Sequence, residues 1–510
     1  MKIEFIEEPL LQFGYEQSLD YPRDGLFLFG PVQDGPRVDV VRYGVVGTPD
    51  GVEHFKKWST KIQTLIEPPL SRDATIAAYN VPFPGFEQAF RAKWPSEPHC
   101  TLATVSPEKL SHALHIANRH EAVKSAVDLY IEELIAEHDR NESLPEFWFV
   151  VIPEEVYRLG RPQSSVPQGD RVRGNVVITE KQAKRLEREP SLFGDEEEQA
   201  VVFKYSKDFR RPLKARLLKH KIVTQLVRET TLNPDAFVSE KGYPLRRIED
   251  PATIAWKLGT AAYYKAGGRP WQLANVRPGV CYVGLVYKRV EDAINPGWAC
   301  CAAQMFLSNG DGVVFRGALG PWYSPDNKQY HLSEKAAESL LATVIAEYRR
   351  LHAGEDPAEL FIHARARFTE GEWSGFKAAC PDKINLVGIQ IRSAGESVKL
   401  FRSGSYPVVR GTALRIRDNT AYLWTTGYVP RLDSYLGPET PNPILVTVWE
   451  GSCPLEVVLQ DILGLTKINF NSCLFNERLP VTIKFADAVG DVLLSAPIEG
   501  NPVLPFKFYV

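Results

Sequence analysis

Four polar residues between positions 210 and 265 have the types and the spacing to bind a phosphate group. Arg210 and Lys214 are four residues apart, so on a helix their side chains lie on one face and can bind the same anion. Pro212 lies between them and is tolerated only where a helix begins. Such a helix start would add its own amide donors to the anion site. Gln225 and Lys265 follow downstream and complete the set.

Lys265 lies at the end of an apolar helical stretch, IAWKLGTAAYYKAGG, which begins at residue 254. Gly267 predicts a cap for this helix, and Lys265 would interact favourably with the helix dipole there. Residues 201–290 contain 18 Lys and Arg against 6 Asp and Glu, although the formal net charge of the whole chain is -3. This concentration of positive charge predicts a surface that holds a nucleic-acid backbone.

The pattern Arg-x3-Lys, followed by a Gln fifteen residues after the Arg and a Lys inside YYKAGGRPW, resembles the MID domain of Argonaute proteins. Farther along, LTKINFNSC (465–473) and LPVTIKFAD (479–487) resemble the closing part of a PIWI domain. The similarity is closest to short prokaryotic Argonautes, which consist of MID and PIWI only, and 510 residues would leave no room for N-terminal and PAZ domains. The resemblance implies a binding site for the 5′-phosphate of a guide strand, formed by Arg210, Lys214, Gln225 and Lys265.

An RNase H-like nuclease uses a cluster of carboxylates to hold two divalent metal ions. The positions that resemble this cluster carry Val286 on the first strand and Arg365 in the segment FIHARARF. No glutamate occurs between residues 292 and 333, where the resemblance implies a mobile one. Only Asp487 remains as a carboxylate. The sequence therefore predicts a groove that binds a strand without cleaving it, and any enzymatic activity is expected in a partner subunit.

The end of the sequence, LPFKFYV, is unusually apolar, whereas chain ends are normally polar. The resemblance implies that Val510 lies between the MID and PIWI domains, where its carboxylate would help to hold Mg²⁺ at the guide phosphate. The alternative is a last edge strand without any role in metal binding.

Strand-like and helical runs alternate along the chain, which predicts an α/β fold. The runs VDVVRYGVVGT and EFWFVVIP read as strands and flank amphipathic helical stretches, in a Rossmann-like order. CYVGLVYKRV (281–290) begins a second set of strands at hairpin spacing, as in an RNase H-like fold. We therefore expect an N-terminal segment and a Rossmann-like MID domain over 1–272, with an insertion at about 163–200, and an RNase H-like PIWI domain over 273–510.

Composition excludes several classes of protein. With 44% hydrophobic and 24% charged residues, the chain is an ordinary globular sequence, and no apolar run approaches the ~20 residues that span a membrane. A cytoplasmic location is expected, since the start MKIEFIEEP lacks the features of a signal peptide. Seven cysteines without a C-x-x-C pair indicate neither a disulfide framework nor a zinc site.

The resemblance implies that the protein loads a guide RNA, recognises complementary single-stranded DNA and activates an associated APAZ-domain effector in prokaryotic defence against plasmids or phage. A TIR-APAZ effector that depletes NAD is favoured, while a sirtuin-like or nuclease APAZ partner stays open. Higher oligomers could form on activation. Two alternatives remain at this point: a guide-dependent nuclease, and a scaffold that keeps a toxic effector inactive without a guide.

Overall fold

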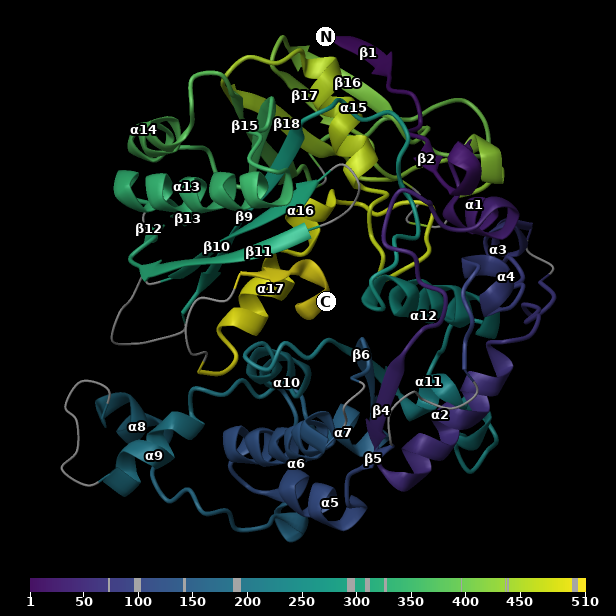
Figure 1. Cartoon of the computed structure of the whole chain (residues 1–510), viewed down its shortest axis with the longest axis vertical. Helices are drawn as coiled ribbons and strands as arrows, with labels where there is room; N and C mark the ends of the chain where they lie inside the picture. The colour runs from purple at the N-terminus through teal and green to yellow at the C-terminus, as the bar shows by residue number, and fades with distance from the viewer. Residues whose placement is uncertain are drawn as a thin grey trace.

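The computed structural model describes the whole chain except residues 72–73, 96–101, 141–143, 187–193, 291–298, 308–311, 325–327, 396, 436, 438–439 and 498–502. Two sheets organise the described part of the chain, and helices cover both faces of each (Figure 1). No helix in these described ranges has both the length and the apolar character to cross a membrane.

The first sheet has four strands in the order β5-β4-β6-β7, and all three pairings are parallel. Its strands are β4 (Tyr43–Gly47), β5 (Ala103–Thr104), β6 (Phe147–Ile152) and β7 (Thr224–Arg228). Successive side chains alternate between the two faces. Val45 and Phe149 pack in one apolar cluster, while Val46 and Trp148 pack in another on the opposite face. This doubly covered parallel sheet confirms the Rossmann-like prediction.

The helices of this first unit wrap both faces of its sheet. One cluster contains residues of α2 and α12, and the other contains residues of α5, α6 and α10. The helices are α1 (Pro22–Phe29), α2 (Pro49–Lys61), α3 (Ala74–Tyr79), α4 (Phe86–Phe90), α5 (Pro107–His115), α6 (Arg119–Arg140), α7 (Glu154–Leu159), α8 (Glu180–Leu186), α9 (Gly194–Val202), α10 (Arg210–Leu217), α11 (Glu229–Leu232) and α12 (Pro251–Lys265). The expected insertion at 163–200 carries α8 and the start of α9, while its residues 187–193 lie outside the described part.

The second sheet has ten strands in the order β1-β16-β17-β18-β15-β14-β9-β10-β11-β19. The expected opening meander is present, since β9, β10 and β11 pair antiparallel. The strands are β1 (Lys2–Phe5), β9 (Val280–Arg289), β10 (Ala299–Leu307), β11 (Gly312–Gly320), β14 (Glu359–Ala364), β15 (Asn385–Ser393), β16 (Thr412–Arg417), β17 (Thr420–Leu423), β18 (Ile444–Glu450) and β19 (Leu504–Pro505). With its mixed pairing, the sheet agrees with the predicted RNase H-like layer.

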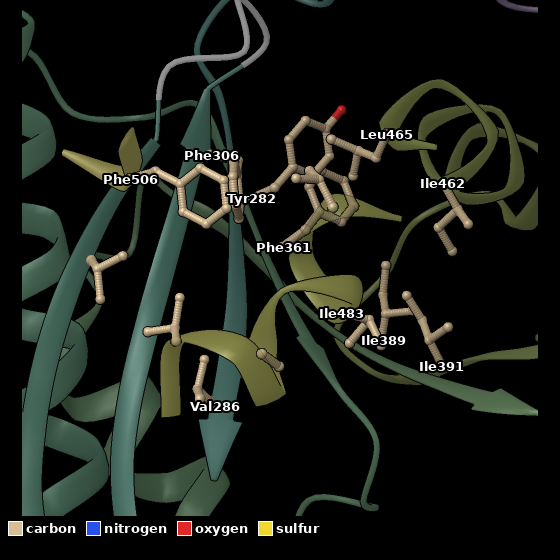
Figure 2. Close-up of a cluster of buried hydrophobic side chains, with 14 of the residues drawn as sticks. Tyr282, Val286, Phe306, Phe361, Ile389, Ile391, Ile462, Leu465, Ile483 and Phe506 are labelled. Atoms are coloured by element: carbon tan, nitrogen blue, oxygen red, sulfur yellow. The ribbon is translucent and has the colours of Figure 1, made fainter. Parts of the chain in front are cut away.

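Two layers of helices cover this large sheet. Figure 2 shows one apolar cluster, which contains Tyr282, Val286 and Phe361 from the strands together with Ile462 and Ile483 from the C-terminal helices. The opposite face packs against α13 and α14. The helices of this unit are α13 (Glu334–Leu351), α14 (Glu370–Ala379), α15 (Leu455–Leu465), α16 (Val481–Lys484) and α17 (Ala486–Leu493).

Short elements connect the two units. A small sheet joins β2 (Leu11–Gln12) with β3 (Ser18–Leu19) and with β8 (Gln272–Leu273), and β12 (Tyr323–Ser324) pairs with β13 (Gln329–Tyr330). Strand β1 precedes the first unit in sequence but pairs with β16 in the second sheet. The 3-10 turns are η1 (Gly14–Glu16), η2 (Gln168–Asp170), η3 (Pro234–Ala236), η4 (Pro430–Leu432) and η5 (Phe506–Phe508).

Candidate nucleic-acid interface

Lys214 lies in α10 and is almost completely buried, with 2% of its surface exposed. Helix α10 begins at Arg210, so Pro212 falls in its first turn as predicted. Leu213 and Leu217 anchor this helix in the core of the first unit. The Lys214 ammonium donates hydrogen bonds to the main-chain oxygen of Thr224 at 3.2 Å and to that of Val510 at 2.8 Å.

Lys265 is the last residue of α12 and is 1% exposed. Gly267 follows with a φ of 95°, which favours glycine, and its amide donates to the carbonyl of Tyr264, so the predicted helix cap is present. The Lys265 Nζ donates to three oxygens: Thr224 O at 2.9 Å, Gln225 Oε1 at 2.6 Å and Val510 O at 2.8 Å. The two lysines therefore share two acceptors although they come from different helices.

The two ammonium groups carry an electrostatic cost that an anion would relieve. Burial, followed by repulsion from Lys265 and Arg210, lowers the pKa of Lys214 well below its ordinary value. Burial, followed by repulsion from Arg210 and Lys507, lowers the pKa of Lys265 in the same direction. A phosphate bound here would stabilise the charged form of both lysines, because opposite charges interact strongly where water is excluded.

Arg210 lies at the start of α10 and is exposed. Its guanidinium forms no hydrogen bond or ion pair with the residues that the structure describes, so it is available to a ligand. The amide donors of this helix start are less available than the sequence indicated, because the Arg210 amide donates to the Asp208 carboxylate at 3.1 Å. The Asp208 carboxylate therefore already occupies an amide that an external anion would otherwise bind.

One cavity of about 760 Å³ contains all of the predicted phosphate ligands. Its volume lies within the range of ligand sites in proteins. Arg210, Lys214, Gln225 and Lys265 line it from the first unit, and Val510 lines it from the second. The sequence analysis did not predict that Tyr157, Arg161 and Arg228 also line this cavity. Asn469, Asn471, Ser472 and Lys484 line it too, and they come from the two segments that resemble a PIWI domain, LTKINFNSC and LPVTIKFAD.

The last residues reach this cavity through a short path from the second sheet. Strand β19 pairs with β11, η5 follows, and Val510 is 4% exposed. Figure 1 shows the C-terminal end between the two units, near α17. Lys507 donates to the carbonyl of Lys265 at 3.2 Å and so ties the tail to α12. The tail is therefore both an edge strand and a wall of the cavity.

The residues around Val510 do not fit a resident Mg²⁺, which the resemblance implied. The Val510 oxygen already accepts hydrogen bonds from two ammonium groups, which would repel a divalent cation. Among the described residues there is no group of three or more His, Cys, Asp or Glu side chains that could hold a metal ion.

The positions that resemble a nuclease centre lie on β9, beyond the end of β14 and on α17. Val286 is 1% exposed and belongs to the apolar cluster of Figure 2, together with Ile483. Arg365 donates to Asp487 at 3.1 Å, and both side chains are exposed. A guanidinium thus faces the one carboxylate at these positions. Parts of the expected glutamate region, 291–298, 308–311 and 325–327, lie outside the described residues.

His363 of β14 and Gly284 of β9 both lie against Thr482 of α16. The Nδ1 atom of His363 lies 2.8 Å from Thr482 Oγ1, and burial lowers the pKa of this histidine to about 3. His363 is paired with Gly284 on the neighbouring strand. A Cβ atom on Gly284 would lie 2.1 Å from the Thr482 carbonyl oxygen, so only glycine lets α16 approach the sheet this closely.

Asp491 on α17 connects the two candidate regions. Its carboxylate accepts from Arg211 Nη2 of α10 at 2.7 Å and from Lys288 Nζ of β9 at 2.6 Å. The helix that carries Lys214 is therefore tied through one side chain to the strand that carries Val286.

Comparisons with known proteins agree with this architecture. No family model and no curated protein match the chain. Among solved structures, Clostridium butyricum Argonaute bound to a guide DNA and a 19-mer target DNA matches at 16% identity with a TM-score of 0.57, covering 98% of this chain and 54% of that one. Aquifex aeolicus Argonaute matches at 13% identity with a TM-score of 0.56, covering 99% and 57%. Aa-Ago with externally bound siRNA matches at 15% identity with a TM-score of 0.54, covering 100% and 56%.

At these identities the likeness establishes the fold, which is that of the MID and PIWI layers of Argonautes. The α/β prediction, with a Rossmann-like layer followed by an RNase H-like layer, is confirmed. The chain spans about half the length of the Argonaute chains that it matches.

Proposed function

We propose that this protein binds the 5′-phosphate of a guide RNA in the cavity formed by Lys214, Lys265, Gln225, Arg210 and Val510. The observation that carries the proposal is the convergence of two buried ammonium groups on the same two oxygens, in a cavity that the exposed Arg210 also lines. Such a site gathers basic side chains that would attract a phosphate group. Guide pairing would then recognise single-stranded DNA, so that the protein itself needs only backbone contacts.

The direct test compares two guides of the same sequence, one with a 5′-phosphate and one with a 5′-hydroxyl. Fluorescence anisotropy with the whole chain should show at least tenfold tighter binding of the phosphorylated RNA, since one charge-assisted contact contributes ~1.5 to 3 kcal/mol. Equal affinity for the two guides would refute the proposed site.

We also propose that the PIWI layer does not cleave the target. Two of the positions that would hold metal carry Val286 and Arg365, and the carboxylate of Asp487 faces the latter guanidinium. Two Mg²⁺ ions need several carboxylates around the scissile phosphate. Labelled complementary DNA should stay intact after incubation of the guide-loaded protein with Mg²⁺ or Mn²⁺. Cleavage at one position that depends on Asp487 would instead establish a guide-dependent nuclease.

The biological role is proposed from the resemblance: an APAZ-domain effector, with TIR-APAZ favoured, binds this protein in the cytoplasm and depletes NAD when guide and target are paired. The duplex can switch such an effector only if it binds the active arrangement more tightly than the resting one. NAD loss in the assembled complex should require both guide RNA and complementary DNA. Equal NAD loss without guide would favour the scaffold, in which the chain restrains the effector without reading any sequence.

A further inference from the structure

Tyr157 in α7 lies on the wall of the same cavity and is surrounded by three arginines. The guanidinium carbons of Arg161, Arg246 and Arg228 lie 3.4, 3.5 and 4.2 Å from the centre of its ring. Arg161 follows α7, Arg228 ends β7, and Arg246 comes from the connection between η3 and α12. Three segments of the chain thus bring one aromatic ring and three cations together.

The Tyr157 ring already contacts guanidinium groups. The guanidinium carbons of Arg161 and Arg246 both lie within 3.5 Å of the ring centre, so a nucleobase that stacked on this ring would compete with them. Contacts of this kind between a cation and an aromatic face hold the guanidinium in place. The ring therefore positions the arginines, and the arginines are the groups that can meet a ligand.

Only one of the three arginines has its charge compensated. Arg246 Nε donates to Glu154 Oε2 at 2.9 Å, and its Nη2 contacts the other oxygen of that carboxylate. Arg161 and Arg228 have no carboxylate within ion-pair distance in the described part of the chain. Two uncompensated guanidinium groups held close together repel each other unless an anion lies between them or beside them.

We propose that Arg161 and Arg228 form a second anion site, which binds the phosphodiester that follows the first nucleotide of a bound strand. This inference rests on the proposed function, because it places the terminal phosphate at Lys214 and Lys265. A strand held there carries its next phosphate one nucleotide farther along, and both clusters line one cavity. Arginine suits this role, since its planar donors match phosphate oxygens.

The test uses three small probes on the whole chain: adenosine 5′-monophosphate, the dinucleotide pApA, and pApA with a neutral methylphosphonate linkage. Isothermal titration should show pApA binding at least tenfold tighter than the mononucleotide. The neutral dinucleotide keeps both bases but loses the internal charge, and it should bind within threefold of the mononucleotide. If the neutral and the charged dinucleotide bind equally, the gain comes from the second base and the inference is overturned.

Variants locate the effect. Arg161→Gln combined with Arg228→Gln should reduce the preference for pApA over its neutral analogue to about one. Arg161→Lys combined with Arg228→Lys keeps the charge and should retain part of the preference, which shows that the variants fold and respond to charge. Arg158→Gln is the matched control, because Arg158 lies on α7, is exposed and does not line the cavity.

The outcomes separate this inference from the proposed function. Binding of the mononucleotide without any gain for pApA would leave the terminal phosphate site intact and overturn only the second site. A gain that survives in the Arg161→Gln, Arg228→Gln protein would also overturn it. Absence of binding by every probe would overturn both.

Discussion

Lys214 and Lys265 donate to the same main-chain oxygen of Val510, each at 2.8 Å. The two lysines belong to different helices of the first unit, whereas Val510 arrives from the second sheet. The site is therefore assembled only when both units are folded together, and its positive charge is held out of water by both.

Replacing both lysines with methionine should abolish the preference for a phosphorylated guide. Methionine keeps much of the buried volume, and exchanging buried charges for apolar groups is often neutral or favourable for stability. We expect the affinity for a 5′-phosphorylated RNA to fall at least a hundredfold, corresponding to ~1.5 to 3 kcal/mol per lost contact, while 5′-hydroxyl RNA changes little. Fluorescence anisotropy measures both. Lys219→Met, at an exposed lysine outside the cavity, is the matched control.

Removal of divalent metal should leave the preference for a 5′-phosphorylated guide in place. The Val510 oxygen already accepts hydrogen bonds from two ammonium groups, and basic side chains would offset the charge of a bound phosphate. Repeating the anisotropy titration in EDTA should change the ratio of the two affinities by less than about threefold, well under ~1.4 kcal/mol. A tenfold loss in EDTA that Mg²⁺ restores would show that a metal ion takes part after all.

A short extension after Val510 should weaken binding of the phosphorylated guide. Val510 is 4% exposed, so added residues would have to leave the cavity and pull its oxygen away from both lysines. The same extension placed before Met1, which is 99% exposed, should be harmless. Parallel titrations of the two tagged proteins make the comparison, and equal affinities would mean that the tail does not contribute to the site.

Stability should fall in mild acid, partly because of His363. Burial holds its pKa at about 3, whereas an unfolded histidine titrates near 6.5, so below pH ~6.5 the unfolded state takes up a proton that the folded state does not. This one group lowers the free energy of unfolding by at most ~1.4 kcal/mol per pH unit between those values. Urea denaturation at pH 7, 6 and 5 should show a shallower pH dependence for His363→Gln. His112→Gln, at an exposed histidine, should keep the wild-type dependence.

Gly284→Ala should destabilise the second unit, because the new methyl group would lie 2.1 Å from the Thr482 carbonyl oxygen. Overpacking of this kind costs about 1 to 3 kcal/mol or more. Gly371→Ala is a matched control: it lies in α14 with no atom within 4 Å of the added group, and it should leave stability unchanged or raise it by up to ~1 kcal/mol. The urea midpoints of the two variants test this prediction. Similar midpoints would mean that α16 moves away from the new methyl group without a loss of stability.

Local spacing in the sequence predicted much of the fold and part of the candidate phosphate site. The Arg210 to Lys214 spacing, Pro212 and Gly267 each act within one helical turn, so the sequence alone determines them. That Gln225 and Lys265 lie together was predicted only from the family resemblance. The periodicity of apolar residues does not show which strand lies beside which later helix. The Tyr157 cluster and the Asp491 contacts were not predictable, because they join segments whose separation in the chain says nothing about their separation in space.

Each end of the sequence packs against the unit that is farther from it along the chain. Strand β1 precedes the first unit in the chain but pairs in the second sheet. Val510 follows the second sheet in the chain but contacts the lysines of the first unit. Loss of the first unit together with β1 would leave an open edge on the second sheet, and loss of the second unit would take from the two buried lysines the Val510 oxygen that they share. Heating should therefore melt the protein in one cooperative transition, and a calorimetric scan should show a single peak in place of two independent ones.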